Sequence, residues 1–359
     1  MATTTSKGLM NLALKAAGSS SINWYPGHMA TAMRDIKERV KVVDLIIEVR
    51  DARVPISSAN IELQEILRRK KHLIVLNKMD LANPNMSNRW SEYFEACKQD
   101  HVFVNAHNKE SVKNMVRQVR TSLSEAIRKE QTLLTMVVGI PNVGKSVITN
   151  SVHRIARYNI SVQEKLKKAE VGPLPGVTQQ ISAFKIGHTP SIYLLDTPGV
   201  LVPNISNIET GLKLALTGAF KDSVVGEERL ARYLLGLLNS RRSSFHVKWK
   251  AEAEAKAFIE DPVAQLKFKK HHHQSDFKTE VRGVIASTLL DYVGNVEDEH
   301  DMEVLVDTQM KELRKLFQIP EEAGDTGWTK VSSKLLNLYR IGKLGAYTWD
   351  IVPEVAAQQ

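Results

Sequence analysis

The order of two short motifs constrains this chain more than any other feature of its sequence. Residues 139–146, GIPNVGKS, have the glycine spacing of a phosphate-binding loop, and the apolar segment LLTMVV directly before them reads as a strand. Asn77, Lys78 and Asp80 form an N-K-x-D pattern, which recognises a guanine base. That pattern ordinarily follows the phosphate loop along a chain, whereas here it comes first. If both matches are real, the strands of the domain are joined in a different order.

The phosphate loop offers several groups to a bound nucleotide. Its glycines let backbone N–H groups turn inward around the phosphates, and the helix that follows adds its N-terminal dipole. Lys145 supplies a positive charge to the β- and γ-phosphates, and the Ser146 hydroxyl is a ligand for Mg²⁺. In LLDTPG, we expect Asp196 to reach Mg²⁺ through a water and the Gly199 N–H to contact the γ-phosphate. Thr178 of LPGVTQQ completes the predicted magnesium coordination.

Asp80 distinguishes GTP from ATP. Its carboxylate can accept two hydrogen bonds from the ring N–H and the exocyclic amine of guanine, a donor pair that adenine lacks. We expect Asn77 to brace the loop and Lys78 to cover the face of the base, while NAHN at 105–108 offers a backbone contact. The residues predicted to bind the nucleotide are Asn77, Lys78, Asp80, Asn105, Ala106, Asn142, Val143, Gly144, Lys145, Ser146, Val147 and Gly199.

Strands and helices alternate along the first part of the chain. Strand patterns are expected at 43–53, 72–80, 101–108, 133–138, 179–187 and 191–199, with helical patterns between them. This alternation predicts an α/β fold with a mostly parallel sheet and helices on both faces. Because motifs at the ends of four strands agree, we predict a circularly permuted P-loop GTPase domain. After about residue 207 the patterns are helical, including residues 288–296.

These patterns predict three parts of the chain. Residues 1–22 contain no Asp or Glu and are expected to be a transit peptide or a disordered N-terminus. Residues 23–215 form the expected GTPase domain, and residues 216–359 a mainly helical domain that binds RNA or the ribosome. Within the latter, KFKKHHH at 267–273 is interpreted as a solvated loop, with contact to RNA phosphates as the alternative.

Composition limits the partners and the compartment. The net charge of +9 favours a polyanionic partner, either nucleic acid or an anionic membrane surface. Cys97 is the single cysteine, which excludes a disulfide within the chain and suits a reducing compartment. No apolar run approaches the roughly 18–20 residues of a membrane span.

In the content and order of its motifs the sequence resembles the circularly permuted GTPases of ribosome assembly, among them the mitochondrial ribosome-associated GTPases, bacterial ribosome biogenesis GTPase A and the DAR GTPases. The resemblance implies a GTP-hydrolysing assembly factor for the large ribosomal subunit, which binds rRNA, is imported into mitochondria and contacts the inner membrane peripherally. Asn60 and NAHN depart from the pattern of that family. The segments that carry the resemblance are WYPGHMATAM, DARVPISS, NKMD, GIPNVGKS, VGPLPGVTQQ, DTPGVL, GLKLALTGAFKD and YRIGKLGAYTWD.

Cleavage of GTP requires a group that orients the attacking water. Ras-type enzymes place a glutamine directly after D-x-x-G, whereas Val200 occupies that position here. The resemblance implies that His28 of PGHMA takes this role and that Asn142 helps to bind K⁺; capping of the first helix is the structural alternative for His28. Histidine suits the role because it titrates near neutral pH. Together with Lys145, His28 is the expected catalytic group, and hydrolysis is expected to be slow alone and faster on the ribosome.

Two other functional classes fit some of these residues. An RNA-binding scaffold that binds GTP with negligible hydrolysis would explain Val200. A trafficking or signalling GTPase would carry the same nucleotide motifs, but the basic charge and the lack of lipidation signals count against it. Chloroplast and cytoplasm are the alternatives to a mitochondrial location.

Overall fold

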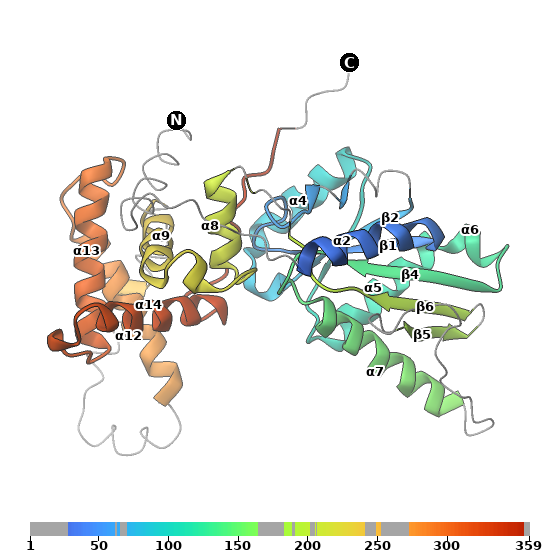
Figure 1. Ribbon diagram of the computed structural model, residues 1–359. Helices are drawn as coiled ribbons and strands as arrows, with labels where there is room; N and C mark the ends of the chain where they lie inside the picture. Colours follow the sequence, from blue (N-terminus) through green and yellow to red (C-terminus); the bar gives the residue numbers. More distant parts are fainter. Residues whose placement is uncertain are drawn as a thin grey trace. The chain divides into compact units, whose positions relative to one another are not determined.

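The chain divides into two compact units (Figure 1). An α/β unit lies within residues 24–206 and 346–359, and a helical unit within residues 207–345. Of the helices in the described ranges, none combines the length and apolar character that a bilayer span needs. The computed structural model describes residues 28–61, 63–64, 70–163, 183–188, 191–201, 205, 207–240, 249–252 and 273–354.

A six-stranded sheet forms the centre of the α/β unit, in the order β3-β2-β1-β4-β6-β5. Its strands are β1 (Leu45–Asp51), β2 (His72–Asn77), β3 (Asp100–Val104), β4 (Thr132–Val138), β5 (Ala183–His188) and β6 (Ser191–Asp196). All pairs are parallel except β5 with β6. The six predicted strands and the mostly parallel sheet are confirmed. Every residue of β1 is buried, as expected for a strand covered on both faces.

Helices cover both faces of this sheet. On one face, α4 (Ser87–Ala96) packs Trp90 and Phe94 against Ile74 and Leu76 of β2. Side chains alternate along a strand, so Asn77 points to the opposite face. There α5 (Lys109–Ser122) packs against α7 (Lys145–Gln163), which also contacts β4, β5 and β6. The structure also describes the helical elements α2 (His28–Arg39), η1 (Val40–Val42), η2 (Met79–Leu81), η3 (Pro84–Met86) and α6 (Ser124–Ile127) in this unit.

In the part that the structure describes, the helical unit consists of helices and their connections. Two buried amides, Asn239 and Gln309, exchange hydrogen bonds of 2.8 and 3.0 Å, which fixes α9 against α13. Arg340 joins the carboxylate of Asp222 and the carbonyls of Ala215 and Leu216. The elements are α8 (Ile208–Leu216), η5 (Asp222–Val224), α9 (Glu227–Asn239), α12 (His273–Leu290), α13 (Glu299–Leu316), η6 (Glu321–Ala323) and α14 (Gly324–Arg340).

One predicted helix is wrong in part. The helical pattern at 288–296 ends at Leu290, because Asp301 of α13 draws the following chain into a turn. Its carboxylate accepts hydrogen bonds from the Asn295 N–H at 2.7 Å and the Tyr292 hydroxyl at 3.3 Å. The segment KFKKHHH lies outside the residues whose side chains are described.

The chain returns to the α/β unit after α14. The Tyr347 N–H donates to the Leu81 carbonyl at 3.1 Å, and the Trp349 N–H donates to the Arg53 carbonyl at 2.8 Å. Asp350 accepts from the N–H groups of Ile56 and Ser57 and from the Ser57 hydroxyl, at 2.7–2.9 Å. Residues 346–354 therefore belong with the sheet, and the compact units divide at 206/207 and at 345/346.

Replacing Asp350 with alanine should loosen the loop at residues 56–57. The change removes three hydrogen bonds from a buried carboxylate, so we expect the free energy of unfolding of the α/β unit to fall by about 1–3 kcal/mol. Urea unfolding measures the loss, and hydrogen exchange should speed up at Ile56 and Ser57. Glu354→Ala, on the same segment but exposed, is the control. Equal stability of the two variants would contradict the role of Asp350.

Candidate nucleotide-binding site

The phosphate loop connects β4 to α7 and lies close to the N-K-x-D loop. Gly144 has a φ of 96°, and a Cβ atom there would lie 2.3 Å from Nδ2 of Asn77. Any other residue would push the two loops apart. The glycine is therefore required by the close approach of β2's loop as well as by the turn itself. Asn142 also has a positive φ, of 60°, a region that asparagine tolerates.

Asn77 joins the two loops that were predicted to hold the phosphates and the base. Its Nδ2 donates to the Val143 carbonyl in the phosphate loop at 2.8 Å. Its Oδ1 accepts from the Ala106 N–H, in the loop after β3, at 3.2 Å. The side chain is 2% exposed, so both hydrogen bonds are shielded from water. These two buried hydrogen bonds are the geometry that the predicted bracing role of Asn77 requires.

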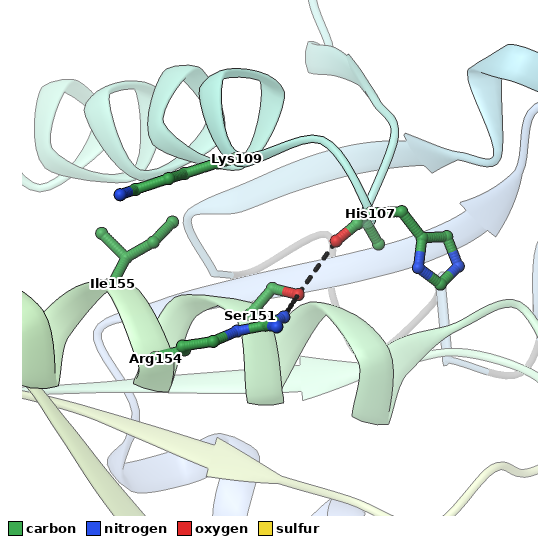
Figure 2. A pocket seen from close by; sticks show the side chains of 6 residues that line it. His107, Lys109, Ser151, Arg154 and Ile155 are labelled. Carbon is green, nitrogen blue, oxygen red and sulfur yellow. Dashed lines mark hydrogen bonds between the residues drawn. The ribbon is translucent and has the colours of Figure 1, made fainter.

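Ala106 is fixed from its other side by α7. The Ser151 hydroxyl donates to the Ala106 carbonyl at 2.9 Å and accepts from Nη2 of Arg154 at 3.1 Å. Figure 2 shows this chain of contacts beside a pocket of about 340 Å³ that His107 and Lys109 also line. The hydrogen bonds from Ser151 through Ala106 and Asn77 reach the phosphate loop without a break.

Lys145, the first residue of α7, interacts electrostatically with Asp196, the last residue of β6. Lys145 is 6% exposed, and its ammonium donates to the Ile140 carbonyl at 2.7 Å. Burial lowers the pKa of Lys145 to about 8, and the negative charge of Asp196 opposes that shift. Burial raises the pKa of Asp196, which Lys145 in turn lowers. A phosphate beside Lys145 would restore the charge balance that burial disturbs.

A magnesium ion fits the oxygens present here. Among the residues that the structure describes, Oδ1 of Asp196 is buried without a hydrogen-bond partner, as a carboxylate that faces a hydrated cation would be. Ser146 is exposed at the start of α7 and can bring its hydroxyl to the same ion. Thr178, the third predicted ligand, lies outside the described residues.

The segment after Asp196 packs tightly on the phosphate loop. A Cβ atom at Gly199 would lie 2.7 Å from Cα of Pro141 and 2.9 Å from Nζ of Lys145. Val200 follows, fully buried; its N–H donates to the Gly139 carbonyl at 3.2 Å. The Val200 carbonyl accepts from Nδ2 of Asn60 at 2.9 Å. Thus Val200 is a fixed apolar residue at the position where Ras-type enzymes orient water.

Lys78 lies at the start of the base loop in a left-handed conformation, with a φ of 61°. Its ammonium donates to the Asn142 carbonyl at 2.7 Å and lies 2.9 Å from Oδ2 of Asp51. Asp80, two residues later in η2, is exposed and able to meet a base edge. The predicted nucleotide residues that lie in the described part therefore gather at the carboxyl ends of β2, β3, β4 and β6.

Some residues of the site were not predicted, and some predicted residues lie outside the part of the chain that the structure describes. Asp51 contacts Lys78, Ser151 contacts Ala106 and Asn60 contacts Val200, although no role at the site was predicted for these three residues. One feature of the sequence could have indicated Asp51 as a site residue: it ends a buried parallel strand, at the edge of the sheet where binding sites form. The side chain of His28, at the start of α2, is not among those described.

Three comparisons place the chain among known proteins. A family model described as "50S ribosome-binding GTPase" matches residues 134–261. The protein "Short integuments 2, mitochondrial" of Arabidopsis thaliana is 49% identical, covering 98% of this chain and 95% of that protein. Mitochondrial ribosome-associated GTPase 1 of Bos taurus is 40% identical, covering 66% and 72%. GNP-bound YlqF from T. maritima aligns with a TM-score of 0.46 at 18% identity, covering 89% of this chain and all of that one.

Replacing Asn77 with alanine should weaken guanine nucleotide binding. The variant loses both tethers and leaves the Ala106 N–H and the Val143 carbonyl unpaired, so we expect GDP affinity to fall at least about tenfold. Titration with a fluorescent GDP analogue measures the change. Asn85→Ala is the control, because Asn85 is an exposed asparagine of η3. If both variants bind GDP like the wild type, the tethers do not support the site.

Proposed function

This chain belongs to the family of circularly permuted GTPases that includes the mitochondrial ribosome-associated GTPases, and from that membership we propose that it is a GTP-hydrolysing assembly factor for the large ribosomal subunit of mitochondria. The observation that best supports its guanine-nucleotide part is the double tether of Asn77, which joins the N-K-x-D loop to the phosphate loop and to the loop after β3. A nucleotide with both a guanine base and phosphates is the ligand that spans the N-K-x-D and phosphate loops.

In the proposed reaction, water attacks the γ-phosphorus, the bond from that phosphorus to the β–γ bridging oxygen breaks, and GDP and phosphate leave. Lys145 would bind the β- and γ-phosphates, and Ser146, Thr178 and Asp196 would hold Mg²⁺, which neutralises the charge that develops on the phosphate oxygens. The Gly199 N–H would donate to a γ-phosphate oxygen. These residues bind and polarise the substrate, and none of them orients the water.

The water requires another residue because Val200 is apolar and held by Asn60 and Gly139. We assign this role to His28, at the first position of α2, and K⁺ binding to Asn142 in the phosphate loop. A histidine can orient the water or accept its proton near neutral pH. Without the ribosome, hydrolysis would be slow.

Both connections to the helical unit begin at the nucleotide site. Along the chain, α8 starts shortly after Val200, and residues 347–350 bind the loops that contain Leu81 and Arg53. Contacts made with the γ-phosphate at Gly199 would therefore act on the chain segment that leads into the helical unit. We propose that this unit binds rRNA in a nucleotide-dependent way.

The proposed location is the mitochondrial matrix, since two of the similar proteins carry mitochondrial names. The chloroplast and cytoplasm are the less favoured locations. Peripheral contact with the inner membrane stays a prediction from the family resemblance. The competing function is a GTP-binding RNA scaffold with negligible turnover, which the buried Val200 favours.

GTP turnover in potassium and sodium buffers, with and without large mitochondrial subunits, tests the proposal. We expect potassium and subunits each to raise the rate, and His28→Ala to lower the stimulated rate by about 10²-fold or more without lowering GDP affinity. His101→Ala is the matched control, since His101 lies at the amino end of β3, away from the site. Tight GTP binding with negligible turnover in every buffer would instead support the scaffold.

Salt dependence separates an rRNA-binding factor from a trafficking or signalling GTPase. Contacts between basic side chains and phosphates release counterions, so affinity for large subunits should fall at least about tenfold between roughly 50 and 200 mM KCl. Co-sedimentation of the full chain with purified subunits measures the affinity. Small subunits control for general attraction to polyanions. Equal binding to both subunits, or salt-independent binding, would contradict the proposed partner.

A further inference from the structure

Asp51, the first residue of the D-A-R sequence, is a buried carboxylate with many partners. It ends β1 and is 2% exposed. Its two oxygens accept from the N–H, Nε and Nη2 of Arg53 at 2.8–3.0 Å, and Oδ2 also lies 2.9 Å from the Lys78 ammonium. Burial opposes ionisation of Asp51, but the charges of Arg53 and Lys78 hold its pKa well below the ordinary value. The carboxylate is therefore charged at every physiological pH.

The contact with Lys78 continues to the phosphate loop. The same ammonium donates to the Asn142 carbonyl at 2.7 Å, so it lies between the end of β1 and the loop after β4. Lys78 has a left-handed backbone, which is strained for a residue other than glycine and persists only where its surroundings hold it. Two fixed acceptors, Asp51 and Asn142, hold the end of this side chain.

We propose that Asp51 is a positioning residue for the guanine nucleotide, which acts by holding Lys78 against the base and the phosphate loop. This inference rests on the proposed nucleotide site. Ordering a free lysine against a base face costs rotamer entropy, and an anchor for the ammonium beyond the base lowers the cost that nucleotide binding must meet. Arg53 compensates the negative charge of the buried carboxylate, and Oδ2 of Asp51 remains within reach of the Lys78 ammonium as its anchor.

The opposite face of β1 offers a matched comparison. Glu48 is fully buried, and one of its oxygens lies 2.8 Å from Nη2 of Arg50 and 3.0 Å from Nε2 of His72. It therefore forms a buried carboxylate–arginine pair on the same strand, like Asp51. In the contacts described, this pair touches no nucleotide loop. Loss of this pair should lower the stability of the fold but leave GDP affinity unchanged, because the pair does not hold Lys78.

A double-mutant cycle on GDP affinity tests the inference. We expect Asp51→Asn to weaken GDP binding about tenfold, Lys78→Met to weaken it at least as much, and the double variant to match Lys78→Met within about twofold. Glu48→Gln, with thermal stability measured for every variant, should leave GDP affinity within about twofold. The ratio of GDP to IDP affinity should not change in Asp51→Asn, because Asp80 reads the exocyclic amine.

A second variant covers the case in which Asp51→Asn does not fold. Arg53→Gln retains the contact between Asp51 and Lys78. It should bind GDP more tightly than the double variant Arg53→Gln/Asp51→Asn, in which the neutral Gln and Asn side chains can still pair with each other but no carboxylate holds Lys78. If the wild type binds GDP but the Asp51 and Lys78 effects add independently, or if Glu48→Gln weakens binding equally, the positioning role is overturned. If the wild type does not bind GDP, the proposed function itself fails.

Discussion

The site depends on one amide side chain, Asn77, between two loops. Parallel strands of a sheet bring their carboxyl ends to one edge, but they do not fix how the loops at that edge meet. Asn77 makes this connection in the buried interior, with one hydrogen bond to each loop. Gly144 provides the space for it, since a side chain there would occupy the position of the Asn77 amide.

The contact that Asn77 makes between these loops does not depend on the order of the strands along the chain. The sheet places β2 and β4 on either side of β1, and the loops after them meet whichever is synthesised first. The permuted order therefore leaves the local chemistry of the edge intact. The permuted order changes which segments connect the domain to the rest of the chain. The segment after Gly199 leads to the helical unit, and residues 346–354 return from it.

The elements with local signals could be predicted from the sequence. Each strand has its own apolar run, so the six strands could be predicted. The phosphate and base motifs have fixed spacings at the ends of those strands, so the clustering of their loops could be predicted as well. Contacts between distant residues carried no such signal: Asn60 to Val200, Asp350 to Ser57 and Ser151 to Ala106 each join segments far apart. The turn after Leu290 was missed for the same reason, because Asp301 of the next helix determines it.

The return of residues 347–350 has a consequence for synthesis of the protein. The loop that follows Asn77 is completed by Thr348, whose hydroxyl accepts from the Asn83 N–H across 265 positions of sequence. A ribosome that translates this chain makes the phosphate loop, the base loop and the whole helical unit before it makes these last partners. The nascent chain therefore cannot finish its base loop during translation of the helical unit, and a stop codon within that unit would leave the loop without this support.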